Sequence, residues 1–120
     1  MSLTVNAATV PVPYICYTGN GSTEGTCTDY TIVATDTKTW GTAGNTTWYV
    51  VNDEVMISSR VTVNGTVNLI LRNGAKLTVN GGIGLNSGNN LNIYPETEDG
   101  TGELNVVAST KYYAGIGGTY

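Results

Sequence analysis

The chain has 120 residues, of which 40% are hydrophobic and only 12% are charged, and its formal net charge is −4. Its five lysines and arginines are scattered, which argues against nucleic acid as a partner because phosphate binding needs a dense cationic face. No apolar stretch has the length of a membrane span, so membrane insertion is not expected. Sixteen glycines and abundant valine and isoleucine favour short strands and tight turns, and we expect almost no helix.

The N-terminal part of the chain is predicted to precede the main fold. Residues 1–13, which open with Met1-Ser2-Leu3, are interpreted as a tag and N-terminal arm. Residues 14–47 are predicted to form a hairpin and a capping loop, the loop containing Trp40 in a glycine-rich stretch. The hairpin and this loop would cover the N-terminal end of the fold.

Two cysteines, Cys16 and Cys27, flank a polar, turn-rich stretch within the predicted hairpin. A hairpin would bring the two sulfurs close together, and the chain has no histidine to complete a metal site. A disulfide is therefore the preferred interpretation, and it would place the protein in an oxidising compartment. The alternative is two separate buried thiols.

A repeat of apolar pairs begins at Glu54 and is visible when the sequence is shifted by 22 residues. Three strand pairs then match in order, and Asn64 matches Asn86 at a turn. The matching pairs are Val55/Ile57 with Leu77/Val79, Val61/Val63 with Ile83/Leu85, and Leu69/Leu71 with Leu91/Ile93. In each strand the alternate residues can point into one shared interior.

This repeat predicts a short right-handed parallel β-helix of about three coils and roughly 22 residues per coil, with an N-terminal hairpin or cap. Asn-Gly dipeptides would serve as its corners, because both residues tolerate positive φ. The same dipeptides could be hairpin turns of an antiparallel β-sandwich, which is the alternative. Hairpins do not require a constant shift between strands, so we favour the β-helix.

The coils are predicted to occupy residues 48–120. Leu104 and Val106 continue the column of Leu77 and Val79 if the preceding corner is longer by five residues, and Tyr49 aligns with Leu71 in the coil before. The Gly-Ile-Gly-Gly sequence at 115–118 is expected to lead into further repeats, so the coils would be truncated at the C-terminus. Self-association is then expected through the segment 104–120, because stacked repeats bury their end faces against a neighbour.

Several stretches resemble the glycine-rich repeat modules of large secreted or cell-surface proteins of gut and other anaerobic bacteria. These proteins are often described as adhesin-like or carbohydrate-binding. The resemblance implies a β-helix architecture similar to that of pectate lyases, and a secreted or cell-wall-associated location. The stretches are Tyr30–Val33, Thr39–Gly41, Trp48–Asn52, Arg60–Gly65, Val67–Leu71 and Tyr113–Gly118.

Catalytic chemistry finds no support in the sequence. Without histidine, a Ser/His/Asp or Cys/His nucleophilic site cannot be assembled. Four carboxylates in or beside a predicted long corner could converge on Ca²⁺, and Lys76 is the available base beside them for lyase chemistry. A solvated acidic surface is the simpler interpretation of these four residues, which are Glu96, Glu98, Asp99 and Glu103.

Exposed aromatic rings suggest a second function, because sugar rings stack on them. Trp40, Tyr112 and Tyr113 are the candidate carbohydrate-binding residues, whereas Trp48 and Tyr49 are expected to close the end of the core. The sequence thus predicts a non-catalytic structural or adhesive surface module, extracellular in location. The alternative is a carbohydrate-binding module, possibly with Ca²⁺, whose partner would be a host or microbial glycan or a surface protein.

Overall fold

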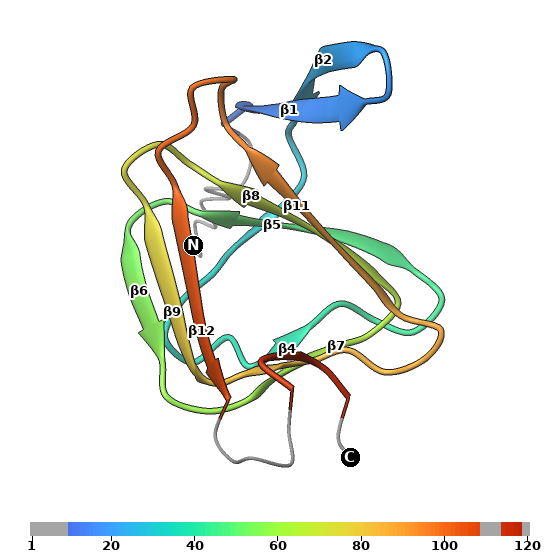
Figure 1. The fold of residues 1–120 in the computed structure, drawn as a ribbon, viewed down its shortest axis with the longest axis vertical. Helices are drawn as coiled ribbons and strands as arrows, with labels where there is room; N and C mark the ends of the chain where they lie inside the picture. Colours follow the sequence, from blue (N-terminus) through green and yellow to red (C-terminus); the bar gives the residue numbers. More distant parts are fainter. Residues whose placement is uncertain (1–9, 109–113, 119–120) are drawn as a thin grey trace, which may run out of the picture.

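The computed structural model describes residues 10–108 and 114–118, and in these ranges it contains strands and no helix. Most strands run parallel and stack as a solenoid of about three turns (Figure 1). The strands are β1 (Val12–Thr18), β2 (Gly21–Cys27), β3 (Thr31–Ile32), β4 (Thr39–Trp40), β5 (Thr46–Val51), β6 (Glu54–Ile57), β7 (Val61–Val63), β8 (Thr66–Leu71), β9 (Lys76–Gly81), β10 (Ile83–Gly84), β11 (Asn90–Pro95), β12 (Glu103–Ala108) and β13 (Ile116–Gly117).

Three parallel sheets form the sides of a triangular prism. Sheet 1 contains β3, β5, β8 and β11; sheet 2 contains β6, β9 and β12; sheet 3 contains β4, β7, β10 and β13. The chain passes from sheet 1 to sheet 2 to sheet 3 in each full coil, as the view down the stack shows (Figure 1). The predicted parallel β-helix is therefore confirmed. The sandwich alternative is wrong, since β1 and β2 form the one antiparallel pair among the described strands.

The 22-residue shift is confirmed in sheets 2 and 3. Val55 lies beside Leu77 and Val61 lies beside Ile83, as the repeat predicted. Leu104 lies beside Leu77, which also confirms the longer corner before β12.

In sheet 1 the predicted register is wrong. Leu69 pairs with Ile93, a shift of 24 residues, and Tyr49 pairs with Leu69, a shift of 20. The corner before β11 contains a turn in which the backbone amide of Asn89 donates to the backbone carbonyl of Asn86. This turn accommodates the additional residues. Because both shifts are even, the inward residues stay inward despite the changed register.

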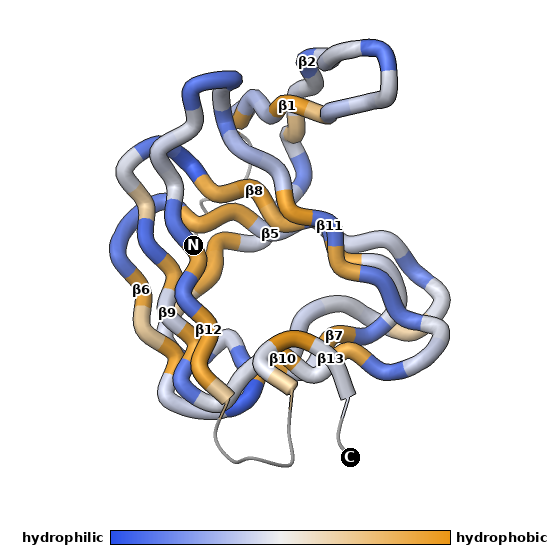
Figure 2. Tube along the Cα trace, in the orientation of Figure 1, coloured by the Kyte–Doolittle hydropathy of each residue, from blue (hydrophilic) through white to orange (hydrophobic). Residues whose placement is uncertain are grey.

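The core fills the interior of the prism and consists of aliphatic columns that run along the stack. In sheet 2, Ile57 and Val79 are neighbours in one column, and both are fully buried. Figure 2 shows that hydrophobic residues occur along the strands of all three sheets. Burial of these columns provides the main driving force for folding.

Glycine turns the chain at corners where strands of successive coils come close. Gly65 has a φ of 68°, and an added Cβ would lie 2.3 Å from the Thr42 carbonyl oxygen. Gly81 has a φ of 143°, and a Cβ there would meet the backbone of Arg60 at 2.5 Å. Asn64 and Asn80 precede these glycines but keep negative φ, so in both Asn-Gly corners glycine alone supplies the unusual backbone conformation.

The N-terminal hairpin forms as predicted, but its position differs from the prediction. β1 and β2 pair from Val12 with Cys27 to Thr18 with Gly21, so the hairpin begins two residues before Tyr14. It lies against the outer face of sheet 1 rather than over the N-terminal end of the solenoid (Figure 1). A second buried cluster holds it there, made of Val12, Cys27, Tyr30, Val50 and Ile70.

The disulfide predicted between Cys16 and Cys27 does not form, and both cysteines are free thiols. The hairpin register pairs Cys16 with Thr23 and Cys27 with Val12. Four residues along a strand, at about 3.3 Å each, therefore separate Cys16 from the position opposite Cys27. This offset of ~13 Å is far beyond the span of a disulfide, whose Cα atoms lie within about 7 Å.

Candidate functional site

Trp40, the first of the predicted carbohydrate-binding residues, is fully buried. Its indole N–H donates to the Thr37 carbonyl at 3.0 Å, and its ring packs 6.0 Å from that of Tyr49. The Tyr49 hydroxyl in turn accepts a hydrogen bond from the Gly41 amide at 2.8 Å. Trp40 therefore belongs to the core at the β4 end of the solenoid, and its proposed contact with sugars is wrong because no ring face reaches the solvent. Tyr112 and Tyr113 lie outside the described residues.

A different aromatic group lies on the outer face of sheet 1, where the hairpin meets the solenoid. Trp48 and Tyr94 are stacked, with ring centroids 5.7 Å apart and an interplanar angle of 21°. Tyr14 of β1 packs on both rings, at centroid distances of 4.8 Å and 5.2 Å. All three side chains are partly buried, and burial raises the pKa of the Tyr94 phenol above its ordinary value. The three rings form a fixed aromatic group.

The expectation that both Trp48 and Tyr49 close the core is correct for Tyr49 only. Adjacent residues of a strand face opposite sides, so Tyr49 points inward and Trp48 outward. The sequence carried a signal for this outer site, because Val50 and Ile70 are apolar at outward positions of β5 and β8 and therefore require a cover. The hairpin supplies that cover and brings Tyr14 to Trp48.

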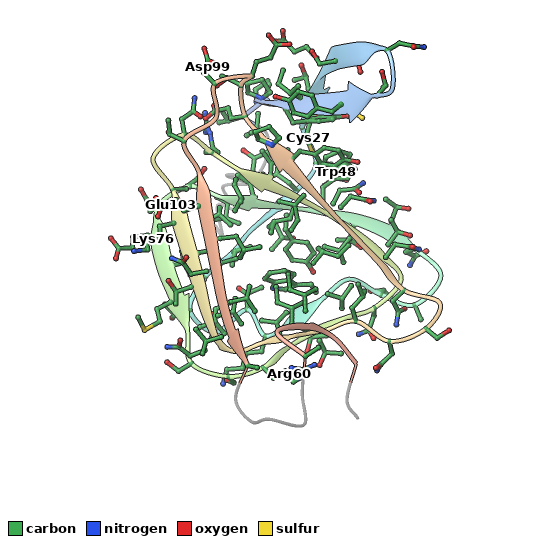
Figure 3. All side chains as sticks on the ribbon, in the orientation of Figure 1. Cys27, Trp48, Arg60, Lys76, Asp99 and Glu103 are labelled. Atoms are coloured by element: carbon green, nitrogen blue, oxygen red, sulfur yellow. The ribbon has the colours of Figure 1, made fainter. Side chains whose placement is uncertain are left out.

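A cleft of about 230 Å³ opens beside Trp48. Its other wall is the chain that leaves the hairpin, and Figure 3 shows Trp48 and Cys27 close together between the hairpin and sheet 1. The lining residues are Thr26, Cys27, Thr28, Asp29 and Trp48. Cys27 is buried, and desolvation raises the pKa of its thiol.

Glu96, the first of the predicted calcium ligands, is used within the fold. Its carboxylate accepts hydrogen bonds from the Arg72 guanidinium at 2.9 Å and from the backbone amide of Asn73 at 2.8 Å. Burial disfavours the charged form, but these hydrogen bonds and the attraction to Arg72 outweigh it, so the pKa of Glu96 is lowered. The carboxylate fixes the long corner between β11 and β12 to the corner of the coil beneath it.

The remaining predicted calcium ligands point to different surroundings. The Glu98 side chain accepts a hydrogen bond from the Ser22 hydroxyl of the hairpin. Glu103 lies beside Lys76 on the outer face of sheet 2, away from Asp99 at the tip of the corner (Figure 3). Among the described residues, no group of three or more acidic, cysteine or histidine side chains could hold a metal ion. The proposed Ca²⁺ site of Glu96, Glu98, Asp99 and Glu103 is therefore wrong, because hydrogen bonding and sheet geometry direct these carboxylates apart.

A larger cleft of about 460 Å³ separates the hairpin from the corner before β12. Pro13 and Ile15 form its apolar part, and acidic and hydroxyl side chains form the rest, including Glu24 and Asp99. The hydrogen bond from the Tyr17 hydroxyl to the Glu98 carbonyl, at 3.3 Å, also joins the hairpin to this corner. This cleft contains no aromatic ring, which distinguishes it from the cleft beside Trp48.

Arg60 organises the last coil of the solenoid. Its guanidinium donates to the carbonyls of Gly81, Ala114 and Gly117, at 3.1, 3.2 and 2.8 Å. The planar guanidinium suits this role because its N–H groups point in fixed directions. Arg60 therefore joins sheet 3 of one coil to the two coils that follow, near β13 (Figure 3).

The β13 end of the solenoid leaves inward residues exposed. Ile93 continues the column of Tyr49 and Leu69, yet it is 40% exposed, and Ile116 continues the column of Val61 and Ile83, yet it is 44% exposed. Both columns are buried in the preceding coils. Within the described residues, β11, β12 and β13 form the last layer of the stack, and we refer to this layer, with its exposed Ile93 and Ile116, as the open end face.

The described part of the chain offers no helix that could cross a membrane. Comparison of the chain with models of protein families, with curated proteins and with solved structures finds no match.

Proposed function

We propose that this chain is a non-catalytic structural and adhesive module of a bacterial cell-surface or secreted protein. The observation that carries the proposal is the open end face, where Ile93 and Ile116 extend buried columns and are 40% and 44% exposed. A solenoid that presents such a face is suited to end-on association. The resemblance to glycine-rich surface repeats supports the extracellular location, whereas the cysteines, being free thiols, no longer do so.

The two ends of the solenoid differ, which determines the expected mode of self-association. At the β4 end, Trp40 and Val33 are buried and close the core. At the other end, the outer edges of β11 and β12 have no strand partner among the described residues, and Ile93 is exposed. Two open end faces can cover each other, whereas an open face and a closed one are not complementary. We therefore propose that two copies of this chain associate through their open end faces.

Sedimentation equilibrium over a range of protein concentrations tests this proposal. We expect a monomer–dimer equilibrium, and Ile93→Asp should weaken it at least tenfold, because a charge would be buried in the interface. Val107→Asp is the matched control, since Val107 lies on the same coil but points outward and is 55% exposed.

A strictly monomeric protein at high concentration would contradict the proposed association. Equal effects of Ile93→Asp and Val107→Asp would place the interface elsewhere, and growth beyond the dimer would refute pairing through the open end faces alone. Circular dichroism melts of both variants confirm that each remains folded.

Carbohydrate binding is the second candidate function. The observation that favours it is the outward position of Trp48 in a cleft with polar side chains. This replaces Trp40 as the aromatic residue on which the function would depend. Ca²⁺ has no part in this version, because the described residues present no metal-binding group.

A further inference from the structure

We infer that the cleft beside Trp48 binds one neutral pyranose unit of a glycan. This inference rests on the proposed adhesive function and gives it a ligand class. It is carried by the juxtaposition, along one cleft, of the outward residue Trp48 from β5 with the exposed polar residues Thr26, Thr28 and Asp29.

The indole of Trp48 is held in place before any ligand arrives. Tyr14 packs on it at 4.8 Å and Tyr94 stacks with it at 5.7 Å, so two rings from two elements fix its orientation. The C–H face of a pyranose can stack on such a ring. A rigid ring loses little conformational freedom on binding, and this lowers the cost of association.

The polar wall of the cleft supplies hydrogen-bonding groups at its rim. Thr26, Thr28 and Asp29 are exposed, and no ion pair to Asp29 is found among the described residues. The Cys27 thiol donates to the Asp29 carbonyl at 3.5 Å, which helps to hold this segment. A carboxylate accepts hydrogen bonds from sugar hydroxyls, while threonine hydroxyls both donate and accept.

The cleft has room for a single sugar ring. The cleft volume of about 230 Å³ is below the usual range of small-molecule pockets, which begins near 300 Å³. A longer glycan would continue outside the cleft, where exposed Asn92 stands in the same outward column as Trp48 and hydrogen-bonds to Asn68 at 2.9 Å. Binding of one sugar ring with few polar contacts beyond it is weak, and adhesion proteins use many such weak contacts together.

Charge selects against acidic sugars. Asp29 lies in the cleft and the chain carries a net charge of −4, so a uronic acid carboxylate would be repelled. The larger acidic cleft beside Glu98 lacks an aromatic ring and is therefore not part of the inferred site.

Fluorescence titration of the full chain tests the inference. The probes are the methyl pyranosides of glucose, galactose, mannose and N-acetylglucosamine, their short oligomers, and glucuronic acid. Trp40 is buried, so acrylamide quenching reports mainly on Trp48. We expect at least one neutral probe to protect Trp48 from acrylamide in a saturable way, with a Kd of about 1 mM, and glucuronic acid to give no protection.

Three variants separate the ligand contacts from the packing. Asp29→Asn should weaken binding at least fivefold without changing the melting temperature, because it removes the charge and keeps the shape. Trp48→Phe, which keeps a ring against Tyr14, should weaken binding. Because this variant lacks the fluorescent Trp48, its binding is measured by calorimetry. Tyr17→Ala is the control and should bind as the unaltered protein does, since Tyr17 lies outside the cleft and is 59% exposed.

The test also distinguishes this inference from the proposed self-association. The Ile93→Asp variant, expected to be monomeric, should bind the same probe with unchanged affinity because Ile93 lies outside the cleft. Absence of saturable binding for every neutral probe, with dimerisation intact, would refute the inferred site alone. Equal binding by Asp29→Asn, Trp48→Phe and the unaltered protein would place any sugar site elsewhere.

Discussion

Leu69 and Ile93 are direct neighbours in one inward column of sheet 1, yet Leu69 is fully buried and Ile93 is 40% exposed. The two residues have the same orientation and similar size, but Leu69 lies between β5 and β11, whereas β11 pairs only with β8 among the described strands. Each coil of a solenoid is buried by its neighbours, and the stability of a position therefore depends on its place in the stack.

Shortening Leu69 should destabilise the protein strongly. Leu69→Ala is expected to lower the free energy of unfolding by about 2–5 kcal/mol, because it leaves a cavity in a closed column. Thr62→Ala, at an exposed outward position of β7, should change it by less than about 0.5 kcal/mol. Urea denaturation measures both, and similar effects of the two changes would contradict the inward and outward assignment.

Two thiols per chain should react in the denatured, unreduced protein. The sequence interpretation predicted none, whereas the hairpin register keeps Cys16 and Cys27 apart. In the native protein Cys27 should react more slowly than Cys16, because it is buried and desolvation raises the pKa of its thiol. Titration with a thiol reagent, followed by peptide mapping, gives both results. Finding no reactive thiol would show that the cysteines form a disulfide after all.

The contribution of Glu96 to stability should be lost in acid. Its pKa is lowered in the folded protein, so the stabilisation is present above the ordinary value of 4.5 and disappears as the pH falls through the folded pKa. Glu96→Gln should therefore cost about 1–2 kcal/mol at pH 7, and progressively less below pH 4.5. Melting at several pH values measures this, with Glu24→Gln as an exposed control. A constant difference across the pH range would contradict the role of the charge.

Arg60 should determine the order of the last coil. Arg60→Lys keeps the charge but cannot reach three carbonyls in fixed directions, so the contact between β10 and β13 should loosen. We expect the Leu85 amide, which donates to the Gly117 carbonyl at 2.9 Å, to exchange hydrogen at least tenfold faster. Lys38→Ala, at an exposed position, is the control. Unchanged protection in Arg60→Lys would show that the backbone alone holds β13.

The parallel stack could be predicted because the side-chain alternation and the spacing between coils are both local properties of the sequence. Val55 with Leu77, and Leu77 with Leu104, follow from counting residues. The register of sheet 1 could not be predicted by counting residues, since the corner before β11 is longer than the repeat implies. The extra residues lie in the corner and do not alter the strands themselves. A corner can absorb an insertion without cost to the core, so a constant shift fails wherever corner lengths differ.

The candidate site shows the same division between local and distant information. Trp40 lies in a glycine-rich stretch that suggests exposure, but its ring fills the closed end of the core. Trp48 lies in a strand that suggests burial, but it points outward to Tyr14 of the hairpin. Neither outcome can be read from neighbouring residues, because each depends on which distant segment covers the ring.

The strand content, the parallel coils and the inward positions follow from the sequence alone, because a strand has a two-residue period and the strands recur at a nearly constant spacing. Three features emerge only from tertiary packing: the hairpin covers the outer face of sheet 1, Cys16 and Cys27 lie apart, and the acidic residues make separate contacts. These features depend on how surfaces far apart in the chain pack together, and that packing is set by the burial of outward residues such as Val50 and Ile70.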